Sequence, residues 1–296
     1  MAVMIDPAIQ SQRRAPAAAK CRSASLSERH WEIEDLDLDS IERSRFARDW
    51  LSFRIAATAS FIETASDLYA RNLAQFFAGD EEIVAWLTST WEPEELRHGA
   101  ALRSYVEHLW PEFSWEQRFD AFLAEYSRTC TIPDLEPAGA LELAARCIVE
   151  MGTSALYRAL HGYAREPVLK NLGALIYADE VRHYKHFYRH FLRYHQRERQ
   201  SRLEVARTLL RRLLATRGED GLYAYRHVWD FAPTRKGFEG DYRSFGQELT
   251  MLIRVHAPPE MLTHMILKPL SLHPRVMNAA ARMSGPLYRL WLSAQT

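Results

Sequence analysis

The sequence predicts an all-α protein, organised as a four-helix bundle with additional C-terminal helices. Only 12 of its 296 residues are glycine, which suits long helices better than a turn-rich β protein. Apolar residues recur at helical spacing in four long segments, and alternating strand patterns are almost absent. Long helices bury their apolar stripes against one another, so a bundle is the expected architecture.

The first elements follow a leader. We expect residues 1–30 to be disordered, with an Arg- and Ser-rich transit peptide as the alternative. A helical pattern then runs from about 42 to 77. Ala78-Gly79-Asp80 breaks it, and Asp80 is placed to cap the next helix.

That next helix is expected over about 81–109, where Pro93 predicts a bend or a local irregularity. A shorter helix over 115–126 and a proline-containing connector over 131–137 follow.

Two further long helices are expected over about 138–163 and 167–194, so that residues 31–200 form the bundle. Residues 201–296 read as a helical extension, packed on the bundle or in a dimer interface. Breaks in this extension are expected at Gly218, Gly221, Pro233, Pro258–Pro259, Pro274 and Pro286.

The composition gives few signs of special partners. There are 38 basic and 38 acidic residues, so the net charge gives no argument for nucleic acid, and we expect none. No apolar run approaches the roughly 20 residues that span a bilayer. Three cysteines without a C-x-x-C suit a reducing compartment. We therefore expect a cytoplasmic protein, or one of an organellar stroma.

Two segments repeat the pattern acid-Glu-x-Arg-His: Glu94–His98 and Asp179–His183. Three residues along a helix rotate the side chain by about 300° and rise about 4.5 Å, so Glu95 and His98 leave one face, as do Glu180 and His183. Carboxylate plus imidazole suits iron or manganese, and the absence of thiolates argues against structural zinc.

Each pair also has a lone glutamate on the preceding helix. Glu63 lies 32 residues before Glu95, and Glu150 lies 30 residues before Glu180. Such separations place residues at similar heights in an antiparallel bundle. One Glu from each of two helices plus Glu-x-x-His from the other two is the dinuclear arrangement of ferritin-like proteins. The sequence thus predicts a ferritin-like four-helix bundle, with exposed salt-bridging positions as the alternative.

The segments that carry these residues resemble the soluble acyl-carrier-protein desaturases over roughly residues 31–195. The match includes the Trp, Trp, Glu-Glu-x-Arg-His-Gly pattern of Trp86–Gly99 and the Ala-Asp-Glu-x-Arg-His box of Ala178–His183. Glu150-x-x-Thr153 matches the family's Glu-x-x-Thr. Trp31-x3-Asp35 is similar to a tryptophan-containing segment implicated in electron entry.

This resemblance implies two iron ions, O2 as co-substrate and oxidation of an unactivated C–H bond, with a carrier-bound acyl chain as the substrate to be desaturated. Thr153 would hand a proton to oxygen, and Asp179 would hold a ligand imidazole. Trp31 is a candidate electron route. The structural alternatives are a helix-bonded hydroxyl for Thr153 and a buried anchor for Trp31.

No flavin or nicotinamide motif is visible, so we expect a ferredoxin-type electron donor. Lys185, Arg189 and Arg193 lie in a stretch rich in basic residues and are candidates for docking an acidic acyl carrier protein, although a solvated helix face is the plainer reading. A homodimer is expected.

Three rival functions remain. The first is a diiron hydroxylase or N-oxygenase of a biosynthetic intermediate, but known N-oxygenases carry an extra histidine where this chain has Ile176. The second is iron storage, in which the C-terminal extension would have no role. The third is a radical-generating subunit, with Tyr157 or Tyr177 as its redox tyrosine.

Overall fold

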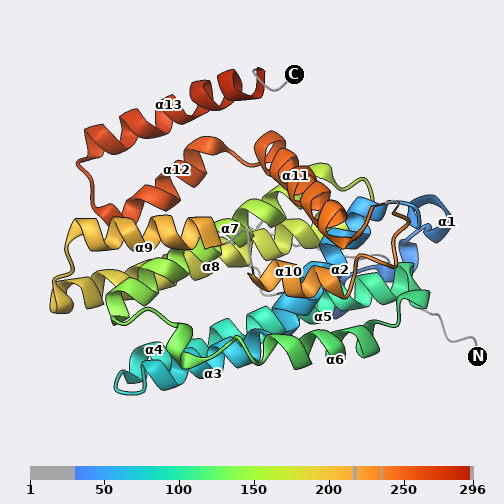
Figure 1. Ribbon diagram of the computed structural model, residues 1–296, viewed down its shortest axis with the longest axis horizontal. Coiled ribbons are helices and arrows are strands. Elements are labelled where there is room, and N and C mark those ends of the chain that lie inside the picture. Colours follow the sequence, from blue (N-terminus) through green and yellow to red (C-terminus); the bar gives the residue numbers. More distant parts are fainter. Residues whose placement is uncertain (1–30, 216–218, 235, 294–296) are drawn as a thin grey trace, which may run out of the picture.

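The computed structural model describes residues 31–215, 219–234 and 236–293, so the leader expected over 1–30 and the break expected at Gly218 lie outside the described residues. Within them the regular structure is entirely helical, which confirms the all-α helical bundle (Figure 1). The α-helices are α1 (Arg43–Phe46), α2 (Trp50–Thr64), α3 (Ser66–Phe76), α4 (Glu81–Trp86), α5 (Glu92–Leu109), α6 (Trp115–Tyr126), α7 (Gly139–Tyr163), α8 (Pro167–Glu198), α9 (Arg202–Ala215), α10 (Glu219–Arg226), α11 (Phe238–His256), α12 (Pro259–Leu267) and α13 (Pro274–Ser293). Short turns are η2 (Ile33–Asp35), η3 (Leu38–Ser40), η4 (Leu87–Trp91), η5 (Pro111–Phe113), η6 (Ile132–Asp134) and η7 (Lys268–Leu270).

Four long helices form the centre of the molecule. α2 packs along α5, α7 packs along α8, and α5 contacts α8 between the two pairs. Many of the side chains that these helices bury are apolar, and Phe53, Phe61, Leu102, Ile148 and Phe187 are fully buried. Burying each such side chain stabilises the fold by about 1.5–3 kcal/mol.

The first expected helix, over 42–77, is divided into α1, α2 and α3, so this part of the prediction was wrong. Asp49 caps α2 by accepting a hydrogen bond from the Ser52 backbone N–H at 3.2 Å. α2 ends at Thr64, and the kink at Ala65 starts α3. The predicted cap is present, since Asp80 accepts from the Ile83 N–H at the start of α4.

The irregularity expected near Pro93 is a π-helical turn, η4, directly before α5. A proline has no backbone N–H, so the turn before it lacks one helical donor. Within the turn, the hydroxyls of Thr88 and Ser89 donate to the carbonyls of Val84 and Ala85, at 3.0 and 2.6 Å. π-helical turns are frequent at functional sites, and this one directly precedes the Glu94-Glu95 pair.

α9, α11, α12 and α13 lie on one side of the bundle, whereas α10 packs on α2 and α6 (Figure 1). α9, α11 and α12 contact α7, and α13 packs on α12. Polar contacts also attach these helices. Arg54 of α2 lies 3.6 Å from the Asp241 carboxylate of α11, and the Tyr184 hydroxyl of α8 donates to the Met265 carbonyl at 2.7 Å.

Some expected breaks in this region were wrong. α10 continues through Gly221 and α13 through Pro286, whereas the chain does leave helix at Pro233 and Pro258. Gly221 lies in the first turn of α10, and a single glycine in a helix costs only about 1 kcal/mol, which tertiary packing can outweigh. None of the described helices is both long and apolar enough to cross a membrane.

Candidate metal centre

The structure brings the six predicted ligand residues together between the four central helices. Each is at most 5% exposed. They form two groups, each with ligand atoms within 4.8 Å of one another, and Glu95 and Glu180 belong to both. Such groups could hold metal ions. The contributors are Glu63 from α2, Glu95 and His98 from α5, Glu150 from α7, and Glu180 and His183 from α8.

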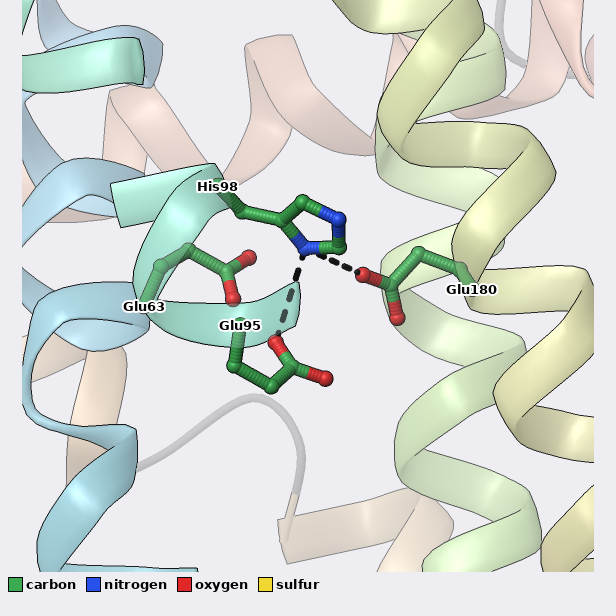
Figure 2. A group of neighbouring side chains, drawn as sticks. All are labelled: Glu63, Glu95, His98 and Glu180. Carbon is green, nitrogen blue, oxygen red and sulfur yellow. Dashed lines mark ion pairs between the residues drawn. The ribbon is translucent and has the colours of Figure 1, made fainter. Parts of the chain in front are cut away.

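The imidazole Nδ1 atoms point into the cluster. Figure 2 shows the half around His98, whose Nδ1 lies 3.2 Å from Glu180 Oε1 and 3.6 Å from Glu95 Oε2. In the other half, His183 Nδ1 lies 3.1 Å from Glu95 Oε1 and 3.5 Å from Glu150 Oε2. The helical spacing of three residues thus places each imidazole above its own glutamate.

The two repeated segments, Glu94–His98 and Asp179–His183, are called the first and second box. In each histidine, the outer imidazole nitrogen is held by a carboxylate from the other box. His98 Nε2 lies 3.0 Å from Asp179 Oδ2, and His183 Nε2 lies 2.8 Å from Glu94 Oε2. An ionised carboxylate can only accept, so each Nε2 carries a hydrogen, which leaves Nδ1 as the nitrogen that could bind a cation. Arg182 supports both carboxylates, at 2.8 Å from Asp179 and from Glu94. Metal-ligating histidines are commonly held in this way.

Several atoms facing the interior of the cluster have no hydrogen bond. They are His98 Nδ1, His183 Nδ1, Glu150 Oε2 and Glu180 Oε1. A buried polar atom without a partner costs about 1–3 kcal/mol, and charged atoms cost more. Divalent cations would satisfy all four atoms together, so the residues present fit a metal centre.

Burial and neighbouring charges shift the pKa values of the glutamates and histidines in the cluster. Burial, together with the charge of Glu95, raises the pKa of Glu63 well above its usual range, and burial likewise raises that of Glu150. Burial opposes protonation of His98 and His183, but their carboxylate partners outweigh it and raise both pKa values. The metal-free cluster therefore retains protons that cations would displace.

Two further predicted residues contact the cluster. The Trp31 indole donates to Asp179 Oδ2 at 2.9 Å and stacks on His98, with ring centroids 6.0 Å apart. Trp31 is both a buried anchor and a direct neighbour of a candidate ligand. The Thr153 hydroxyl lies 2.6 Å from Glu180 Oε2 and 3.2 Å from the Glu150 carbonyl, and the shorter contact is to the glutamate ligand.

The predicted docking residues lie on the outer face of α8, away from the cluster. Lys185 is exposed. Arg189 lies 3.4 Å from Glu82, and Arg193 lies 2.6 Å from Glu82 and 2.7 Å from Asp80. The two arginines therefore form ion pairs with acids at the start of α4.

The two tyrosines considered as redox residues differ in position. Tyr157 is fully buried, and its hydroxyl donates to Glu63 Oε1. The Tyr177 hydroxyl instead contacts Met261 Sδ at 3.2 Å. Of the two, Tyr157 is the one bonded to a candidate ligand.

Glu94 was not assigned a role from the sequence. Its carboxylate holds His183, just as Asp179 holds His98. The signal was in the repeat itself, since both boxes open with an acid. Local patterns pair each acid with the histidine of its own helix. In the fold, each acid instead bonds to the histidine of the other box.

Comparison of the chain with protein-family models, curated proteins and solved structures gives no match.

Proposed function

We propose that this protein is an O2-dependent non-haem diiron oxidase that acts on an unactivated C–H bond, as a desaturase of a carrier-protein-bound acyl chain. The observation that carries the proposal is the pair of four-residue groups sharing Glu95 and Glu180. Four carboxylates and two imidazoles without thiolates match the preference of iron in dinuclear carboxylate sites.

Each residue has a definite task in this proposal. Glu63 and His98 would hold one ion and Glu150 and His183 the other, and Glu95 and Glu180, which belong to both groups, could contribute to both. The bound iron would supply the reaction with O2 and the oxidising power for C–H cleavage. Thr153 would hold a proton against Glu180 Oε2, and Trp31 would pass electrons from a ferredoxin-type donor through Asp179 to His98.

The test is a reaction of the iron-loaded protein with O2, ferredoxin and its reductase, and a series of carrier-bound acyl chains. Mass spectrometry of the product separates the candidate outcomes. Loss of two hydrogen atoms supports desaturation, and gain of one oxygen atom supports the hydroxylase alternative. If the protein with bound, reduced iron oxidises none of the acyl chains, the proposal that its substrate is an acyl chain is wrong.

Carrier docking is tested best at Lys185. Reversing Arg189 or Arg193 would also set an acid against Glu82, so weakened binding could reflect damage to α4. Lys185→Glu avoids this, because Lys185 is exposed on α8. We expect weaker binding of acyl carrier protein by this variant, measured by calorimetry, and unchanged binding would remove α8 as the docking face.

A further inference from the structure

Tyr157 is a buried polar group that the proposed function leaves unused. Its side chain is fully enclosed on α7, two turns beyond Glu150. Its hydroxyl donates across the bundle to Glu63 Oε1 on α2. A phenol buried in an apolar bundle needs a hydrogen-bond partner, and this one has a candidate metal ligand as its partner.

The two metal positions have the same types of candidate ligand. Each has one histidine and one glutamate of its own, and both share Glu95 and Glu180. Within the described part of the chain, no hydroxyl donates to the Glu150 carboxylate, and its Oε2 has no hydrogen bond. The phenol on Glu63 is therefore a difference between the terminal carboxylates of the two positions.

We propose that Tyr157 is a positioning residue that makes the two metal positions inequivalent, because its hydroxyl takes up one lone pair of Glu63 Oε1 and so favours Oε2 as the oxygen that would bind the ion. Glu150, without such a donor, is free to bind its ion through Oε2 and to adjust its orientation. This inference rests on the metal centre of the proposed function, but not on the reaction catalysed there.

The hydrogen bond also fixes the Glu63 side chain before any ion arrives. A ligand held by an outer partner loses less conformational freedom on binding, and removal of such partners typically weakens metal affinity by about 10–100-fold. The effect should be confined to one of the two ions, since Tyr157 contacts Glu63, which belongs to one group alone.

The experiment is an anaerobic titration of the metal-free full chain with Co(II), followed by visible absorption and by competition with a chelator. The absorption bands of Co(II) report its coordination number and geometry. In the wild type we expect two binding steps with different spectra. In Tyr157→Phe, we expect one step to weaken about 10–100-fold with an altered spectrum, while the other is unchanged.

Tyr225→Phe is the matched control. The Tyr225 hydroxyl donates to Asp241 Oδ2 at 2.5 Å, so this variant removes the same buried phenol–carboxylate bond outside the cluster. It should lower the free energy of unfolding while leaving both Co(II) steps intact. Equal weakening by both variants would mean that Tyr157 acts only through general stability, which overturns the proposal.

A double-mutant cycle tests whether Tyr157 acts through Glu63. In the Glu63→Ala background, Tyr157→Phe should have no further effect on Co(II) affinity, and an additive effect would contradict the proposal. Two identical Co(II) spectra in the wild type would also overturn it, whether or not the variant folds. Binding of fewer than two ions by the wild type would instead overturn the dinuclear centre itself.

Discussion

At the scale of single residues, the centre depends on a crosswise exchange between the two boxes. Asp179 precedes the ligand Glu180 in the chain but holds His98 on α5, and Glu94 precedes Glu95 but holds His183 on α8. Each bond fixes one imidazole with Nδ1 inward. The same bonds join α5 to α8, so ligand orientation and helix packing are coupled.

This exchange predicts which ion each acid controls. Asp179→Asn should lower the affinity for the ion bound by His98 by about 10–100-fold. Glu94→Gln should lower the affinity for the ion bound by His183 by a similar factor. Chelator competition would measure both affinities. Asp134→Asn is the control, because that carboxylate caps an exposed turn through the Thr131 hydroxyl. Unchanged affinities in both site variants would show that the outer nitrogens are not held as described.

A second residue-scale prediction concerns His190, which is buried beside α4. Burial and the neighbouring charges of Arg193 and Arg189 lower its pKa from 6.5 to about 4, against the opposing charges of Glu82 and Asp80. Arg193 donates to His190 Nδ1 at 3.1 Å, so protonation would break this bond and place two cations together.

The sign of the pH effect follows from proton binding. Between pH 6.5 and about 4, the unfolded chain binds a proton at His190 that the folded chain does not, so stability falls as pH falls through this window. His190→Gln should therefore lose less unfolding free energy than the wild type over this range in urea titrations. His264→Gln, an exposed histidine on α12, is the matched control. Parallel losses in wild type and His190→Gln would contradict the assignment.

At the scale of elements, the contact between α2 and α5 places half of the ligands. The helices approach closely at Gly99, the residue after His98, which faces Thr64, the residue after Glu63. A Cβ atom at position 99 would lie 2.6 Å from the Thr64 backbone nitrogen and 2.9 Å from its Cα. Gly99, which directly follows the first box, thus allows α2 to lie close enough to α5 for Glu63 to reach the cluster.

Gly99→Ala should accordingly separate α2 from α5. We expect a loss of about 1–3 kcal/mol of unfolding free energy, measured by urea denaturation, together with weaker metal binding. Gly152→Ala on α7 is the control, because nothing lies within 4 Å of its added Cβ. That variant should be neutral or up to about 1 kcal/mol more stable. Wild-type stability and metal affinity in Gly99→Ala would show that the close approach is not needed.

The same elements show how far the sequence predicts this fold. α6 begins and ends where expected, and the boxes lie on helices, because helical spacing of apolar residues is a local feature of the sequence. The kink at Ala65 has neither glycine nor proline to mark it, and it follows from packing. The partners of Glu94 and Tyr157 depend on neighbours about 90 residues away, which local patterns do not encode.

At the scale of the whole molecule, the candidate centre joins two helix pairs. One group takes its ligands from α2, α5 and α8, and the other takes them from α5, α7 and α8. Bound ions would therefore connect α2 and α5 with α7 and α8. Three of the C-terminal helices, α9, α11 and α12, pack on α7, which carries Glu150, Thr153 and Tyr157, so they support the helix with the largest share of site residues outside the two boxes.

The measurement that tests the central claim most directly is iron per chain, by elemental analysis after anaerobic Fe(II) loading. We predict about two irons in the wild type, and fewer in both Glu95→Ala and Glu180→Ala, since each of these residues belongs to both groups. Glu112→Ala, which removes an exposed glutamate, should keep the wild-type value. An iron-free wild type, or equal iron in all four proteins, would contradict a dinuclear centre at this site.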